Sequence, residues 1–131
     1  MKLILFDIDG TLMQTHGVGR RSVAFALHTV LGRDVDTTPV SFSGKTDPQI
    51  FSEILEHEQE ENADTLLPVL LRVYETEMHR AMPTADITVL PGARELVAQL
   101  STDPRAHLAL LTGNIEPMAF LKVEAAGLGE H

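Results

Sequence analysis

Two short continuous runs of apolar residues, one near each end of the chain, predict strands. Leu3 to Phe6 form the first run, and the second extends from His107 to Leu111. Continuous runs of this length, rather than alternating ones, are typical of parallel strands that are buried on both faces. We therefore expect both runs to lie in one sheet.

Between the two runs, apolar residues recur at the three- and four-residue spacing of amphipathic helices. The pattern predicts helices over 20–31, from 47 to about 55, and from about 65 to 80. Asp47-Pro48 is interpreted as an N-cap followed by the first helical residue, and Pro68 is expected in the first turn of its helix. Two further helices flank the second run, one opened by Pro91-Gly92 and one closed by Gly127-Leu128.

This order of elements predicts an α/β fold, with a Rossmann-like parallel sheet core, incomplete in this chain, and an inserted all-helical cap. Residues 1–13 and 88–131 are assigned to the core, and residues 14–87 to the cap. The two strands should lie parallel and adjacent. Residues that follow them then meet at the carboxyl edge of the sheet, where open α/β proteins bind ligands.

Two carboxylates follow the first strand, in the string Asp7-Ile8-Asp9-Gly10-Thr11. Buried carboxylates are costly unless something compensates them. Residues two apart on a strand face the same way, so Asp7 and Asp9 can act on one point. Gly10 permits a sharp turn whose N–H groups can face an anion. A metal dication together with a phosphoryl group would account for this arrangement.

Thr112-Gly113-Asn114 follows the second strand. A hydroxyl and neighbouring N–H groups at a helix N-terminus are suited to hold phosphoryl oxygens. Alone, this tripeptide is more typical of a turn in which Asn114 caps the next helix. Its pairing with the acidic string about a hundred residues upstream favours the phosphate-binding interpretation.

The acidic string and the strand that ends in threonine resemble the first two motifs of the haloacid dehalogenase-like hydrolases. Gly44-Lys45-Thr46-Asp47 resembles the cap loop of phosphoglycolate phosphatase-like members, and residues 89–100, VLPGARELVAQL, resemble their return to the core. The resemblance covers nearly the whole chain.

The resemblance implies a magnesium-dependent phosphomonoester hydrolase that acts on a small phosphorylated metabolite through an aspartyl-phosphate intermediate. Asp7 would be the nucleophile and Asp9 the general acid and base, while Mg²⁺ would bind the Asp7 carboxylate and the Asp9 carbonyl. The phosphoryl oxygens would be held by Thr112, Gly113, Asn114 and the backbone near Ile8. Lys45 is a candidate for substrate contact from the cap, with a solvated loop lysine as the alternative.

Two motifs of the family are not evident in the chain. Members carry a third-motif Lys or Arg and a fourth motif of acidic metal ligands, whereas Lys122 is the only Lys or Arg after Thr112. We interpret Lys122 as an ordinary lysine on a helix surface. The chain is therefore expected to be the N-terminal portion of a longer hydrolase, to bind magnesium poorly and to turn over slowly or not at all.

Two other functions remain open. A phosphoglucomutase-like enzyme would keep the aspartyl-phosphate but transfer the phosphoryl group within a sugar. A receiver-like, non-catalytic phosphoacceptor or binding module would also use an acidic pair beside a strand that ends in threonine. The helical insertion directly after the first strand disfavours the receiver, because receivers lack it.

Composition narrows the class of partner. The 131 residues predict one domain, and the formal net charge of −9 disfavours nucleic acid and acidic membranes as partners. No apolar run reaches the ~18 residues that a membrane span requires. The chain has no cysteine, and its six histidines, which lack ligand spacing, are interpreted as surface or helix-face residues. A cytoplasmic location is expected.

Overall fold

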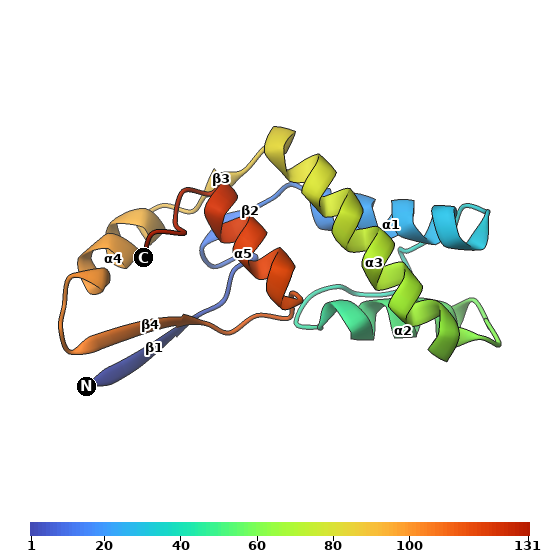
Figure 1. Cartoon of the computed structure of the whole chain (residues 1–131), viewed down its shortest axis with the longest axis horizontal. Helices are drawn as coiled ribbons and strands as arrows, with labels where there is room; N and C mark the ends of the chain where they lie inside the picture. The colour runs from blue at the N-terminus through green and yellow to red at the C-terminus, as the bar shows by residue number, and fades with distance from the viewer.

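The computed structural model describes all 131 residues. β1 (Lys2–Phe6) and β4 (Ala106–Leu110) form one two-stranded sheet, and β2 (Met13–Gln14) pairs with β3 (Thr88–Val89). In Figure 1, helices α1 to α3 occupy one end of an elongated molecule, β1, β4 and α4 occupy the other, and α5 lies between them. The fold is thus α/β with a small parallel sheet, as predicted.

β1 and β4 are parallel neighbours, which confirms the predicted pairing. Phe6 lies opposite Leu110, and the Leu111 N–H donates to the Phe6 carbonyl at 2.8 Å, so both strands end at one edge of the sheet. The prediction that β1 is buried on both faces was wrong: Leu3 is 66% exposed and Leu5 49% exposed. Phe6 and Leu110 pack toward α4 and α5 on one face of the sheet, whereas Leu3 and Leu5 point from the other face.

The acidic string lies in a tight turn rather than on the strand. The N–H groups of Thr11, Leu12 and Met13 all donate to the carbonyl of the fully buried Ile8. Because β1 ends at Phe6, the two-residue strand period does not orient Asp7 and Asp9. The backbone of this turn orients the two side chains instead, and Gly10 at φ 78° permits the turn.

The helices agree with the sequence pattern apart from their first turns. They are α1 (Val18–Leu31), α2 (Asp47–His57), α3 (Ala63–Ala81), the 3₁₀ turn η1 (Met82–Thr84), α4 (Ala93–Ser101) and α5 (Glu116–Ala125). The N-cap of α2 is Thr46, whose hydroxyl accepts from the Gln49 N–H at 3.3 Å, and not Asp47 as expected. Pro68 lies inside α3, beyond its first turn.

The buried apolar side chains form two hydrophobic clusters. One joins α1, α2 and α3 around Phe51 and Tyr74, whose rings meet edge to face at 5.7 Å. The other joins the β1 loop, α4 and α5 around Ile8 and Val97. Helix α5 contributes to both, because Met118 packs in the cap cluster while Val123 packs in the core cluster.

No helix in the structure is long and apolar enough to cross a membrane.

Candidate functional site

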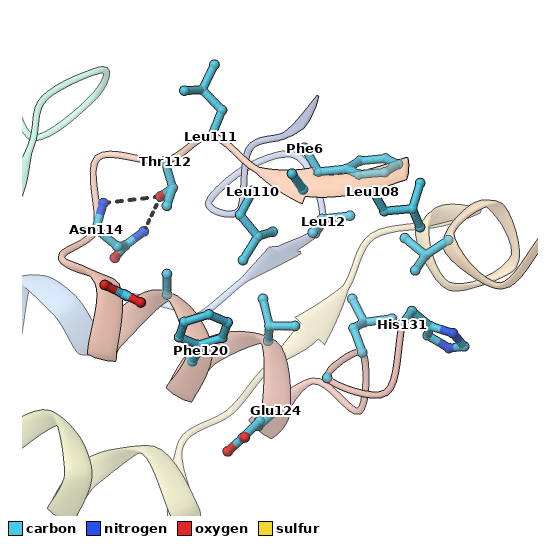
Figure 2. Close-up of a pocket in the computed structure, with 17 residues that line it drawn as sticks. Phe6, Leu12, Leu108, Leu110, Leu111, Thr112, Asn114, Phe120, Glu124 and His131 are labelled. Atoms are coloured by element: carbon cyan, nitrogen blue, oxygen red, sulfur yellow. Dashed lines mark hydrogen bonds between the residues drawn. The ribbon is translucent and has the colours of Figure 1, made fainter. Parts of the chain in front are cut away.

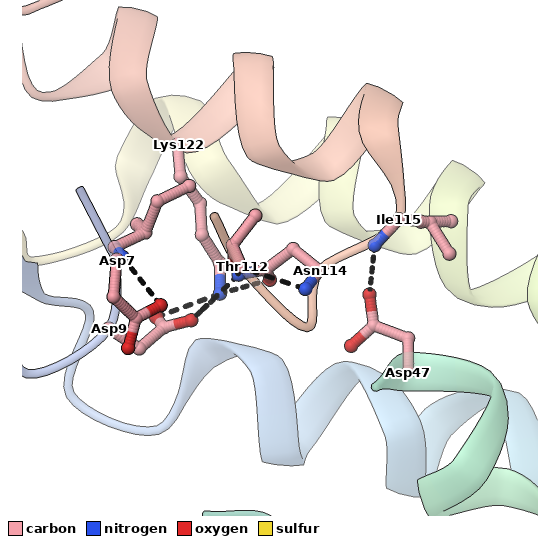
Figure 3. A network of polar contacts seen from close by, with 8 residues as sticks. Asp7, Asp9, Asp47, Thr112, Asn114, Ile115 and Lys122 are labelled. Carbon is pink, nitrogen blue, oxygen red and sulfur yellow. Dashed lines mark hydrogen bonds and ion pairs between the residues drawn. The ribbon is translucent and has the colours of Figure 1, made fainter. Parts of the chain in front are cut away.

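The loops that follow β1 and β4 meet at the carboxyl edge of the sheet. Figure 3 shows Asp7 and Asp9 on one loop and Thr112 and Asn114 on the other, with α5 above them. The sequence predicted this juxtaposition from two parallel, adjacent strands.

Lys122 reaches the centre of this site, so its interpretation as a surface lysine was wrong. The residue is 4% exposed. Its Nζ donates to both carboxylate oxygens of Asp9 at 2.9 Å and to Asn114 Oδ1 at 2.7 Å. A buried ammonium is tolerated here because all three of its donors are used.

A signal in the sequence could have identified Lys122. The buried positions of α5 are Met118, Ala119, Lys122 and Val123, which is the three- and four-residue spacing of one helix face. A lysine on the apolar stripe of a helix requires an acidic partner. Asp9 is that partner, although it lies 113 residues away in sequence.

Asn114 ties the two loops together instead of capping α5. Its Nδ2 donates to Asp9 Oδ2 at 2.9 Å and to Thr112 Oγ1 at 2.7 Å. Its backbone N–H also donates to Thr112 Oγ1, at 3.1 Å. Since the threonine oxygen accepts both bonds, its own proton is free to be donated to a ligand.

Asp7 is the least constrained member of the site. Its Oδ1 accepts from the Ile8 N–H at 2.8 Å, and the residue is exposed. The other carboxylate oxygen forms no hydrogen bond within the chain and faces solvent. The Ile8 N–H, a candidate phosphate donor in the sequence, is engaged by Asp7.

Lys45 does not direct its side chain to the acidic pair. Its ammonium pairs with Glu53 of α2, and this hydrogen bond lowers the pKa of Glu53. The backbone of the same loop does reach the site, since the Asp47 N–H donates to the Gly113 carbonyl at 2.8 Å. Asp47 Oδ2 accepts from the Ile115 N–H, also at 2.8 Å.

The residues of the site supply only some of the ligands that a magnesium ion needs. No group of three acidic or histidine side chains that could hold a metal occurs in the structure. The free oxygen of Asp7 and the Asp9 carbonyl, which accepts no hydrogen bond from the protein, are two hard oxygen ligands. Mg²⁺ commonly binds one or two protein carboxylates and takes its other ligands from substrate phosphate and water.

A cavity of about 590 Å³ lies between the sheet and α5 and adjoins the site. Figure 2 shows Leu108, Leu110 and Phe120 around it, with Thr112 and Asn114 at one end. Most of its lining is apolar, so it does not suit a phosphoryl group. The polar network at its end is the candidate site.

Solved structures share this fold. A predicted phosphoglycolate phosphatase from Haemophilus somnus 129PT aligns with 99% of the chain at 18% identity and a TM-score of 0.70. CbbY from Rhodobacter sphaeroides, in complex with phosphate, aligns with 95% at 22% identity and 0.74. A HAD family hydrolase from Deinococcus radiodurans R1, with bound phosphate and sodium, aligns with 98% at 25% identity and 0.50.

The chain spans only part of these proteins: 59% of the first, 56% of the second and 53% of the third. No curated protein gives a significant sequence match. The family model of the haloacid dehalogenase-like hydrolases matches residues 4–131 of the sequence, and the chain belongs to that family.

Proposed function

We propose that the chain carries the nucleophile and the phosphate-binding half of a magnesium-dependent phosphomonoester hydrolase that acts on a small phosphorylated metabolite. The network that joins Asp9, Lys122, Asn114 and Thr112 at the carboxyl edge of the sheet is the observation that carries this proposal. The phosphate bound in two of the similar structures supports it.

The reaction would proceed in two steps. An oxygen of Asp7 attacks phosphorus, and the bond from phosphorus to the ester oxygen breaks while that oxygen takes a proton from Asp9, which would have to be protonated and separated from Lys122 at this step. Water then attacks the aspartyl-phosphate, gives a proton back to Asp9, and releases inorganic phosphate and free Asp7. The exposed Asp7 suits the nucleophile because one of its oxygens is free.

Thr112 would donate to the phosphoryl group and Lys122 would offset its charge, while Asn114, whose Nδ2 and backbone N–H donate to Asp9 and Thr112, would position these residues. The ammonium of Lys122 supplies a positive charge beside the acidic pair, which offsets the repulsion between a carboxylate nucleophile and a phosphate dianion. The Thr112 proton, left free by the hydrogen bonds from Asn114, can be donated to a phosphoryl oxygen. We assign to Lys122 the role of the family's third-motif basic residue.

A bound Mg²⁺ would neutralise further phosphate charge. The Asp7 carboxylate and the Asp9 carbonyl would hold it, because the Asp9 carboxylate is engaged by Lys122 and Asn114. Lys45, paired with Glu53, has no part in this proposal.

Trapping with beryllium fluoride tests the nucleophile without requiring turnover. In ¹⁹F NMR with Mg²⁺ present, the parent chain should give a bound fluoride resonance, because beryllium trifluoride mimics a phosphoryl group on a carboxylate. Asp7→Asn should abolish this resonance, since a neutral amide cannot bond beryllium in the same way.

Asp64→Asn is the matched control, because Asp64 is exposed in the first turn of α3 and lies outside the site. It should trap as the parent does. A parent chain without a magnesium-dependent resonance, or an Asp7→Asn variant that retains it, would contradict the proposal.

A further inference from the structure

The cap loop before α2 and the loop after β4 are joined by two hydrogen bonds that run in opposite directions. The Asp47 N–H donates to the Gly113 carbonyl, and the Asp47 carboxylate accepts from the Ile115 N–H, each at 2.8 Å. Figure 3 shows Asp47 facing Ile115 across the boundary between cap and core. One cap residue therefore fixes the backbone on both sides of Asn114.

Gly113 gives independent support for this contact. A Cβ at this position would overlap the Lys45 carbonyl oxygen and lie 2.8 Å from the Lys45 carbonyl carbon and 3.2 Å from Thr46 Cα. All of these are backbone atoms, which no rotamer change can move aside. Gly113 is not in the left-handed region, so it is the cap loop that excludes a side chain there.

Asp47 is buried without an ion-pair partner of its own. It is 8% exposed and forms none of the salt bridges in the structure. Burial raises the pKa of Asp47, while the bond from Ile115 and the charge of Lys122 act in the opposite direction. A lone buried carboxylate costs stability, and here its specific contact is with the loop that carries the candidate phosphate ligands.

We propose that Asp47 is a positioning residue that couples docking of the cap to the geometry of the loop after β4, which carries the candidate phosphate ligands. With the cap docked, Asp47 holds Gly113 and Ile115, and thereby Asn114, whose side chain orients Asp9, Lys122 and Thr112. Without that contact the loop relaxes and loses affinity for phosphate. The functional part of this inference rests on the proposed phosphatase function; the coupling itself does not.

Amide hydrogen exchange at Ile115, measured by NMR on the 131-residue chain, tests the coupling directly. Asp47→Ala should speed this exchange about tenfold or more, the effect of losing one hydrogen bond to a carboxylate. Asp47→Asn keeps an acceptor oxygen and should give an intermediate rate. Asp64→Ala, an exposed aspartate in the same cap, should leave the exchange at Ile115 unchanged.

A titration with inorganic phosphate, followed through the Thr112 and Asn114 amides, gives the second readout. Asp47→Ala should weaken phosphate binding about fivefold to tenfold, with partial rescue by Asp47→Asn, whereas a purely structural role would leave the affinity of the folded variant unchanged. Gly113→Ala keeps Asp47 but displaces the cap loop. It should also speed exchange at Ile115, and it provides the test if Asp47→Ala does not fold.

Unchanged Ile115 exchange in folded Asp47→Ala, or in Gly113→Ala, would overturn the coupling. Unchanged phosphate affinity despite faster exchange would overturn the positioning role. Neither result depends on beryllium trapping at Asp7, so failure of this inference can be distinguished from failure of the proposed function.

Discussion

At the scale of single residues, the charge on Lys122 stands out because water reaches so little of it. Its side chain is 5% exposed, whereas that of its partner Asp9 is 49% exposed. Removal of the lysine charge therefore leaves a carboxylate that water can still solvate, so the usual penalty for breaking a buried ion pair is reduced. Stability and ligand binding should respond differently to a change at this position.

Lys122→Met should lower the affinity for beryllium trifluoride about tenfold or more, because the phosphoryl analogue loses its nearest ammonium. The methionine fills the apolar path of the lysine stem, so the melting temperature should stay the same or rise. ¹⁹F NMR and thermal denaturation measure the two effects. Lys2→Met, at an exposed lysine, should change neither, and undiminished trapping by Lys122→Met would refute the role of Lys122.

Residue chemistry also explains which parts of the site could be predicted. The meeting of Asp7 and Thr112 follows from two apolar runs that each end in polar residues, because parallel strands share one carboxyl edge. The link from Asp47 to Ile115 could not be predicted, since the string Thr46-Asp47-Pro48 satisfies local capping rules with Asp47 as the cap. Only the folded chain shows Thr46 capping the helix and Asp47 free to cross to the core.

At the scale of elements, α5 connects the two hydrophobic clusters and the site. Met118 packs with the cap, Val123 with the core, and Lys122 lies on the same buried face. The sequence pattern predicted that α5 is a helix. It did not predict that α5 contacts the cap cluster, the core cluster and the site together, because this depends on where α3 and η1 lie. The loop before α5 is held against the cap by the hydrogen bond from the Ile115 N–H to Asp47.

The titration of Asp47 should make stability depend on pH at this junction. Burial raises the pKa of Asp47 above its ordinary value, so at a pH between the two pKa values the folded chain retains a proton that the unfolded chain has lost. The resulting stabilisation is present at low pH and is lost as pH rises through the folded pKa. Asp47→Asn does not titrate, so its melting temperature relative to the parent should increase as pH rises from the ordinary pKa of an aspartate through the raised pKa of folded Asp47. A difference that shrinks with rising pH would contradict this sign.

At the scale of the whole molecule, the two-stranded sheet leaves one face without a covering layer. Leu3 and Leu5 are exposed on that face, and Leu111 is 65% exposed just beyond β4. Unpaired strand edges beside exposed apolar side chains favour association between chains. The sequence predicted the strands but gave the wrong burial, because a continuous apolar run does not reveal how many layers cover it.

The double variant Leu3→Lys with Leu5→Lys should therefore reduce self-association of the 131-residue chain in sedimentation velocity, with little change in melting temperature. Exposed side chains contribute little to the folded core, and added charge repels a second copy. Phe25→Lys is the control, because Phe25 is 47% exposed on α1, away from the sheet. Equal association of parent and double variant would exclude this face as the contact.

The fit of Gly113 against the Lys45 carbonyl has a consequence for chimeras within the family. A cap transplanted from another member would bring its own main-chain path to this point, and a core with alanine at the equivalent of Gly113 could not receive the present one. The cap loop and the β4 loop must therefore be exchanged as a matched pair. Sequence changes in one of these loops therefore restrict the sequences that the other loop can tolerate.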